Sequence, residues 1–126
     1  MNDILDSVEE FHKVFELPVG EKPRIVPHAE AALRYNLMYE ENEEYLEAAL
    51  KNDLIGIADA LGDQLYVLAG TMLVHGLQHK IVEVFQEIHR SNMSKLGEDG
   101  KPIRREDGKV LKGPDYFKPN IEKILS

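Results

Sequence analysis

The stretch LMYEENEEYLEAAL, residues 37–50, places four glutamates within five consecutive positions of a predicted helix. At about 100° per residue, Leu33, Leu37 and Ala48 mark a side of this helix that should face the core. Three of the glutamates fall on that same side: Glu40, Glu41 and Glu44. Most runs of glutamates form solvated surfaces, but a carboxylate on an apolar side is costly to remove from water. The stretch therefore predicts that something compensates for this charge.

The next predicted helix, LIGIADALGDQLYVLAGTMLV at residues 54–74, is apolar on nearly all sides and still carries Asp59 and Asp63. These aspartates are one turn apart and share one side. The helix contains no Lys or Arg to pair with them, and an unpaired buried carboxylate is destabilising. Carboxylates on two neighbouring apolar helices repel each other unless a cation lies between them. A hard divalent ion, Mg²⁺ or Mn²⁺, suits such an all-oxygen set of ligands.

Iron and zinc are less favoured, because di-iron bundles need paired Glu-x-x-His motifs and Glu87 with His89 has the wrong spacing. We interpret the five histidines, His12 and His28 among them, as surface or interface residues.

The rest of the pattern predicts an all-α fold without clear strand alternation. Helices are expected over about 2–16, 28–52, 54–75 and 78–95. Asp53 can cap the third helix and Gly76 can end it. We expect a single domain, residues 1–126, with an antiparallel four-helix bundle-like core over about 1–96. Residues 97–126 are rich in Gly, Pro and charge, and predict an irregular basic segment with a short hairpin-like piece and a last helical turn at IEKILS.

The composition excludes several function classes. With no cysteine among 126 residues, thiolate chemistry and zinc–thiolate sites are excluded. A formal charge of −8 argues against a nucleic-acid partner. The N-terminus lacks the pattern of a signal peptide and no apolar run reaches membrane-spanning length, so we expect a cytoplasmic protein with no membrane partner.

The charge is unevenly distributed along the chain. Residues 1–89 hold 17 acidic residues and 6 Lys and Arg, whereas residues 90–126 hold 6 acidic residues and 9 Lys and Arg. The acidic part and the basic part could simply attract each other. Alternatively, the acidic part could hold metal cations and the basic part a phosphorylated ligand.

Two acidic motifs resemble those of a known superfamily. EENEE at residues 40–44, followed by DALGDQLYVLAG at residues 59–70, is similar to the all-α nucleoside triphosphate (NTP) pyrophosphohydrolases. This MazG-like superfamily includes phosphoribosyl-ATP pyrophosphohydrolase and the all-α dUTPases. Its motif is Glu-Glu-x-x-Glu on one helix and Glu-x-x-Asp on the next. The first part matches Glu40, Glu41 and Glu44, and the last aspartate is Asp63.

The second motif departs from the pattern at one position. Ala60 occupies the place of the expected glutamate. Asp59, one position earlier, keeps a carboxylate on the side of Asp63 and is the expected substitute.

The resemblance extends to the C-terminal part. EIHRSNMSKL at residues 87–96 and DGKVLKGPDYFKP at residues 107–119 are similar to segments of bacterial and phage members of this superfamily. Such segments carry an Asn-x-x-Lys pair and a basic loop near the phosphates. Asn92 and Lys95 match the pair, and the periodicity of residues 81–95 places them on the apolar side of their helix. Lys109 and Lys112 lie in the loop.

The resemblance implies metal-dependent hydrolysis of a (deoxy)nucleoside triphosphate to the monophosphate and pyrophosphate. The implied metal ligands are Glu40, Glu41, Glu44, Asp59 and Asp63, with Mg²⁺, or Mn²⁺, as the cofactor. Glu41 and Glu44 are the candidate catalytic residues, although Glu40 could also take the proton of the attacking water. The implied substrate-binding residues are Asn92, Lys95, Lys109 and Lys112.

Three further expectations concern substrate, assembly and the competing function. By the resemblance alone, a dUTP- or dCTP-like nucleotide is the expected substrate, and phosphoribosyl-ATP is less favoured. A homodimer or homotetramer is expected, because the third helix is apolar on more sides than a four-helix monomer covers. The alternative is a non-catalytic helical module of the same fold that binds a nucleotide or a protein, which Ala60 favours.

Overall fold

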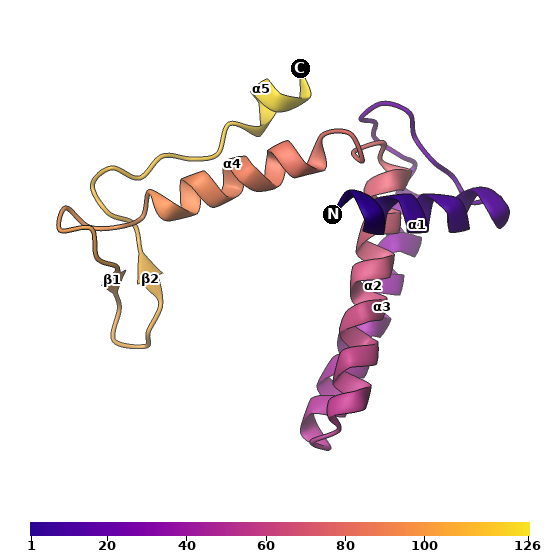
Figure 1. Cartoon of the computed structure of the whole chain (residues 1–126), viewed down its shortest axis with the longest axis horizontal. Helices are drawn as coiled ribbons and strands as arrows, with labels where there is room; N and C mark the ends of the chain where they lie inside the picture. Colours follow the sequence, from indigo (N-terminus) through magenta and orange to yellow (C-terminus); the bar gives the residue numbers. More distant parts are fainter. The chain divides into compact units, whose positions relative to one another are not determined.

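The computed structural model describes residues 1–126 and is mostly helical (Figure 1). The elements are α1 (Asn2–Val14), α2 (His28–Leu50), α3 (Leu54–Val74), α4 (Ile81–Met93), β1 (Ile103–Arg104), β2 (Val110–Leu111) and α5 (Ile121–Leu125). The two strands pair antiparallel as a short hairpin. The all-α prediction is confirmed, with the irregular C-terminal segment where the sequence places it.

The chain forms two compact units, Met1–His79 and Lys80–Ser126, and each is described by itself. The first unit holds α1, α2 and α3. The second holds α4, the hairpin and α5.

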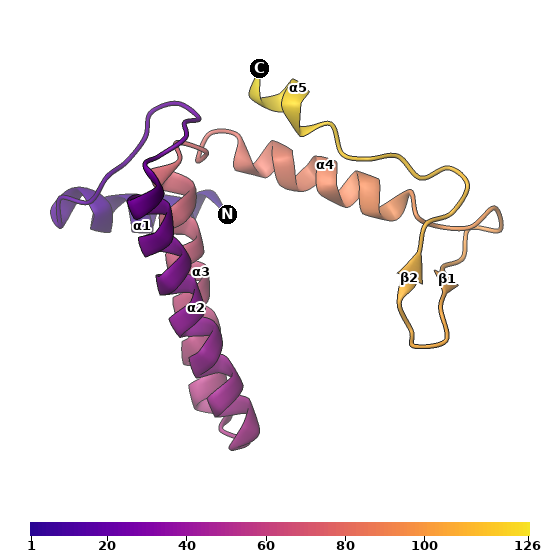
Figure 2. The same cartoon turned by 180° about the vertical axis from the view of Figure 1, so that it is seen from behind.

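The antiparallel pair of α2 and α3 is the centre of the first unit, and the two helices lie side by side in both views (Figures 1 and 2). A short turn joins them. In this turn the Asp53 side chain accepts a hydrogen bond from the Gly56 amide at 3.0 Å and caps α3, as predicted. After α3, Gly76 has a φ of +67°, a conformation that glycine adopts without strain. The helix α1 packs on α3.

The buried side of α2 agrees with the predicted one only in part. Ala48 is buried as predicted, but Leu33 is 55% exposed and Arg34 is buried instead. The side that meets α3 runs through Arg34, Glu41 and Ala48, so the helix is rotated away from the orientation that the leucines indicate. The expectation that Leu33 faces the core is therefore wrong.

The histidine interpretation also needs correction at one position. His12 is only 2% exposed. Its ring lies against Gly70 of α3, where the absence of a side chain leaves room for it.

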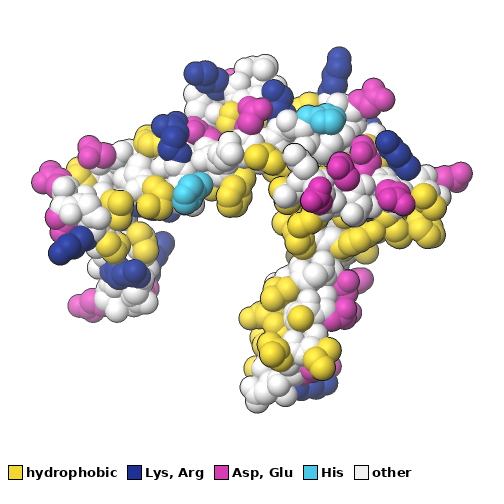
Figure 3. Space-filling view, in the orientation of Figure 1, with side chains coloured by type: hydrophobic (Ala, Val, Ile, Leu, Met, Phe, Trp, Pro, Cys, Tyr) yellow, Lys and Arg dark blue, Asp and Glu magenta, His cyan; other side chains and the backbone are white.

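Many apolar side chains of the α2–α3 pair remain exposed, and Figure 3 shows hydrophobic side chains gathered along the two helices. On α3 they are Leu54, Ile55, Leu61, Leu65, Tyr66 and Leu68. By length and composition α3 is long and apolar enough to cross a membrane, so the expectation that no apolar run reaches that length is wrong. One such helix is weak support for a membrane span, since the core helix of a soluble protein can have the same length and composition.

In the second unit the C-terminal segment packs along α4. The Ser91 hydroxyl donates to the Phe117 carbonyl at 2.7 Å, and the Asn120 amide donates to Glu87 Oε2 at 2.7 Å. The Arg90 guanidinium lies 4.4 Å from the centre of the Phe117 ring. These contacts bury Ser91 and leave Phe85, on another side of α4, 68% exposed.

Candidate active site

The acidic cluster is formed where α2 and α3 face each other. The antiparallel register places Glu41 opposite Asp63, and one residue further the Gln64 amide donates to Asn42 Oδ1 at 2.9 Å. Glu44 follows Glu41 by one turn and therefore projects on the same side of α2.

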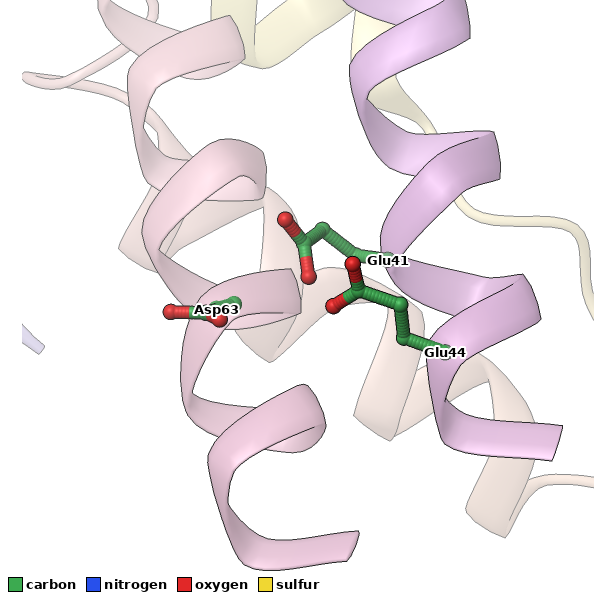
Figure 4. A group of neighbouring side chains, drawn as sticks. All are labelled: Glu41, Glu44 and Asp63. Carbon is green, nitrogen blue, oxygen red and sulfur yellow. The ribbon is translucent and has the colours of Figure 1, made fainter. Parts of the chain in front are cut away.

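Oxygen atoms of Glu41, Glu44 and Asp63 all lie within 4.8 Å of one another (Figure 4). Figure 4 shows the two glutamates extending from α2 toward the aspartate on α3. Glu41 and Asp63 are half-buried and Glu44 is exposed. The cluster is thus open to solvent at Glu44 and partly covered at Glu41 and Asp63.

The position of Glu41 in this cluster changes the pKa of its carboxyl group. Burial raises the pKa of Glu41 from 4.5 to about 7, helped by a hydrogen bond to Glu44 and by the charges of Glu44, Asp63 and Asp59. In addition, Glu41 Oε2 is buried and has no hydrogen-bond partner. A buried acceptor without a donor costs about 1–3 kcal/mol, so this oxygen is suited to an added cation or donor.

A hard divalent cation fits these residues. Carboxylate oxygens are the ligands that Mg²⁺ and Mn²⁺ prefer, and three of them already converge here. The orphaned oxygen of Glu41 offers a ligand that nothing else in the chain uses.

Two of the predicted ligands lie outside this group of three. Asp59 is exposed, but its charge acts on Glu41, so it lies nearby. Together with Glu44 and Ala60 it lines a pocket of about 190 Å³ beside the cluster. Glu40 is exposed on α2 and is not part of the group, because the rotation of α2 turns the side through Glu41 toward α3.

The predicted phosphate-binding residues belong to the second unit. Asn92 is exposed on α4 and Lys95 is half-buried just beyond its end. Lys109 and Lys112 are exposed, and Lys112 Nζ lies 4.7 Å from the centre of the Tyr116 ring. Their role stays a prediction.

No motif above singles out Arg34, which the structure buries between α2 and α3. The spacing of residues on the two helices could have indicated that Arg34 faces α3. Arg34, Glu41 and Ala48 are seven residues apart on α2, and Gly56, Asp63 and Gly70 are seven apart on α3.

Comparisons relate this chain to known proteins. No curated protein sequence matches the chain. A solved structure from Exiguobacterium sp. 255-15, described provisionally as an NTP pyrophosphohydrolase, is similar over 94% of this chain and 90% of that chain. Its sequence identity is 26% and its TM-score is 0.51. The family model for phosphoribosyl-ATP pyrophosphohydrolase matches residues 8–92, which is more than half of the chain and includes every acidic residue of the cluster. The resemblance to the all-α NTP pyrophosphohydrolases is thereby confirmed, and the chain belongs to the phosphoribosyl-ATP pyrophosphohydrolase family.

Proposed function

We propose that this protein is a divalent-metal-dependent enzyme that hydrolyses a (deoxy)nucleoside triphosphate between the α and β phosphates. The products are the nucleoside monophosphate and pyrophosphate. The observation that carries this proposal is the convergence of Glu41, Glu44 and Asp63, with an unpartnered buried oxygen on Glu41, in a chain of this family.

The carboxylates have two tasks in this reaction. Glu41, Glu44 and Asp63 would hold Mg²⁺ or Mn²⁺, with Asp59 and Glu40 as further ligands from the same two helices. When bound, such a cation would offset the negative charge that develops during phosphoryl transfer.

The second task is proton removal from the attacking water. Water attacks phosphorus, the bridging bond between the α and β phosphates breaks, and pyrophosphate leaves with the electron pair of that bond. Glu41 or Glu44 takes the proton of the water.

Asn92, Lys95, Lys109 and Lys112 are proposed to bind the triphosphate. An amide and ammonium groups are suitable donors to phosphate oxygens. The exposed Lys109 has a free ammonium group for this purpose.

The preferred substrate is proposed to be dUTP- or dCTP-like, on the resemblance of the C-terminal segment alone. Phosphoribosyl-ATP is the competing substrate, because the matched family carries its name. The protein is proposed to act in the cytoplasm as a homodimer or homotetramer. The apolar side chains exposed on α3, including Leu61 and Leu65, support self-association.

A pyrophosphate-release assay tests the proposal. All dNTPs, all NTPs and phosphoribosyl-ATP are offered with Mg²⁺, with Mn²⁺ and with a chelator. We expect release from at least one substrate with metal and none with the chelator. A folded protein that releases no pyrophosphate from any substrate would falsify the enzymatic proposal.

The second candidate function is a non-catalytic nucleotide-binding or protein-binding module. The observation that favours it is Ala60, which is buried at the position of the expected glutamate. Calorimetric binding of a nucleotide that is recovered unhydrolysed identifies this alternative.

A further inference from the structure

The contact between Arg34 and α3 lies outside the acidic cluster. Arg34 is 8% exposed, which is unusual for an arginine. Its Nε donates to Thr71 Oγ1 at 3.1 Å and its Nη2 donates to the Val67 carbonyl at 2.9 Å. The Thr71 hydroxyl donates to the same carbonyl at 2.8 Å. The rigid fork of the guanidinium is thus fixed against one turn of α3.

Gly70 makes this contact possible. A β-carbon at this position would lie 2.6 Å from Arg34 Nη2 and 2.8 Å from His12 Nε2. Neither side chain is free to move away. Arg34 Nη2 is hydrogen-bonded to Val67, and His12 Nδ1 hydrogen-bonds the Pro18 carbonyl at 3.0 Å. All three helices of the first unit therefore meet at Gly70.

The same register continues along the pair of helices. Residues seven apart lie on nearly the same side of a helix and about 10.5 Å apart along its axis. A β-carbon on Gly56 would lie 3.1 Å from the β-carbon of Ala48, so this glycine also sits at a close approach. The facing pairs, in order along α2, are Arg34 with Gly70, Glu41 with Asp63, and Ala48 with Gly56. The carboxylates thus lie midway between two close contacts.

We propose that Arg34 is a positioning residue that, clamped to α3 across Gly70, fixes the register of α2 and so holds Glu41 and Glu44 opposite Asp63. Assigning the held carboxylates to a metal rests on the proposed function, whereas the clamp itself does not.

Electrostatics explains why a clamp is needed. Three carboxylates within 4.8 Å repel one another when no cation is present. A rotation of α2 by one residue would relieve that repulsion and would turn Glu41 out of the cluster. The hydrogen bonds of Arg34 oppose such a rotation and keep the ligands preorganised for a cation.

The test compares variants of α3 by Mn²⁺ titration calorimetry at pH 8 without nucleotide, using the full chain. Thr71→Val removes the hydroxyl that accepts from Arg34 with little change of shape, and Thr71→Ser retains it. Gly70→Ala inserts a methyl group under the guanidinium. Gly62→Ala is the matched control on the same helix, because a β-carbon there meets nothing within 4 Å.

We expect Thr71→Val and Gly70→Ala to weaken Mn²⁺ binding by about tenfold or more, as the loss of supporting contacts does in other metal sites. Thr71→Ser and Gly62→Ala should bind as the wild type does. If Thr71→Val and Gly70→Ala melt at lower temperature but bind Mn²⁺ normally, Arg34 is only a structural residue and the inference is overturned. If Gly70→Ala does not fold, the two Thr71 variants decide the question.

A wild-type protein that binds no Mn²⁺ would remove the metal from the proposed function without deciding the role of Arg34. The register is then measured directly by NMR, from nuclear Overhauser effects between the Ala48 methyl and the Gly56 α protons. Loss of these contacts in Thr71→Val and not in Thr71→Ser supports the clamp. Their persistence in every variant overturns it.

Discussion

Two glutamates of α2 each have a buried oxygen without a hydrogen-bond partner, Glu30 Oε1 and Glu41 Oε2, but their surroundings differ. Glu30 lies near Arg34. Burial lowers the pKa of Arg34, and the charge of Glu30 opposes that effect. Glu41 lies near Glu44 and Asp63, which add to the effect of burial in raising its pKa. The chain supplies a cation to one carboxylate and only further acids to the other.

Within one pair of helices, the two glutamates thus differ in role. Glu30 is buried near an opposite charge of the chain, whereas Glu41 is buried among like charges. Near Arg34 the chain itself supplies the charge opposite to Glu30, although Glu30 Oε1 has no hydrogen-bond partner. At Glu41 the opposite charge is left to be supplied by a cation from solution. Removing a charge should therefore have opposite effects on stability at the two places.

The largest effect is expected for Glu44→Gln. Loss of a ligand or proton acceptor should lower kcat/KM by about 100-fold or more. The same change removes a repulsive charge from the cluster, so the metal-free protein should melt at the same or a higher temperature. Pyrophosphate release and thermal melts with a chelator measure the two effects.

Glu43→Gln is the matched control, because Glu43 is exposed on the same helix and lies outside the cluster. It should leave both quantities near the wild-type values. Loss of folding in Glu44→Gln would mean that this glutamate is structural.

A smaller effect is expected from pH, through Glu41. Its pKa of about 7 in the folded, metal-free protein lies above the ordinary 4.5, so the protonated form is favoured by folding. This contribution to stability is complete below about pH 4.5 and is lost as the pH rises through about 7. A metal ion needs the ionised carboxylate and must displace the proton at lower pH.

Mn²⁺ affinity should therefore be about tenfold lower at pH 6 than at pH 8. Calorimetry at the two pH values measures this ratio. Glu41→Gln should bind Mn²⁺ more weakly and lose most of the pH dependence. An equal pH dependence in that variant would assign the titration to another group.

Much of the fold could be predicted from the sequence, because local signals determine it. Helical periodicity predicts α2 and α3, and the Asp53 cap and Gly76 fix the two ends of α3. The convergence of acids from both helices follows from the spacing of Glu41, Glu44 and Asp63.

The orientation of α2 could not be predicted in the same way. Periodicity identifies an apolar side through Leu33, but the contact with α3 buries Arg34 instead. A charged residue is assigned to the surface unless its partners are known, and here those partners are a hydroxyl and a carbonyl on another helix. The burial of His12 depends on Gly70 in the same manner.

The smallest effect is expected at Asp53, a third kind of carboxylate on this pair of helices. It is exposed, and its Oδ1 already accepts from the Gly56 amide at 3.0 Å, so neither an internal cation nor a metal is needed to satisfy it. Asp53→Ala should lower the free energy of unfolding by about 1 kcal/mol through loss of the cap. Asp53→Asn, which retains a capping oxygen, should lose much less. Urea unfolding measures both changes, and the Mn²⁺ affinity of Asp53→Ala should remain that of the wild type.

If that variant instead lost Mn²⁺ binding to the same extent as Glu41→Gln, then a carboxylate with a hydrogen-bond partner would be as important to the site as one without. Whether a carboxylate has a partner within the chain would then not account for where the metal binds.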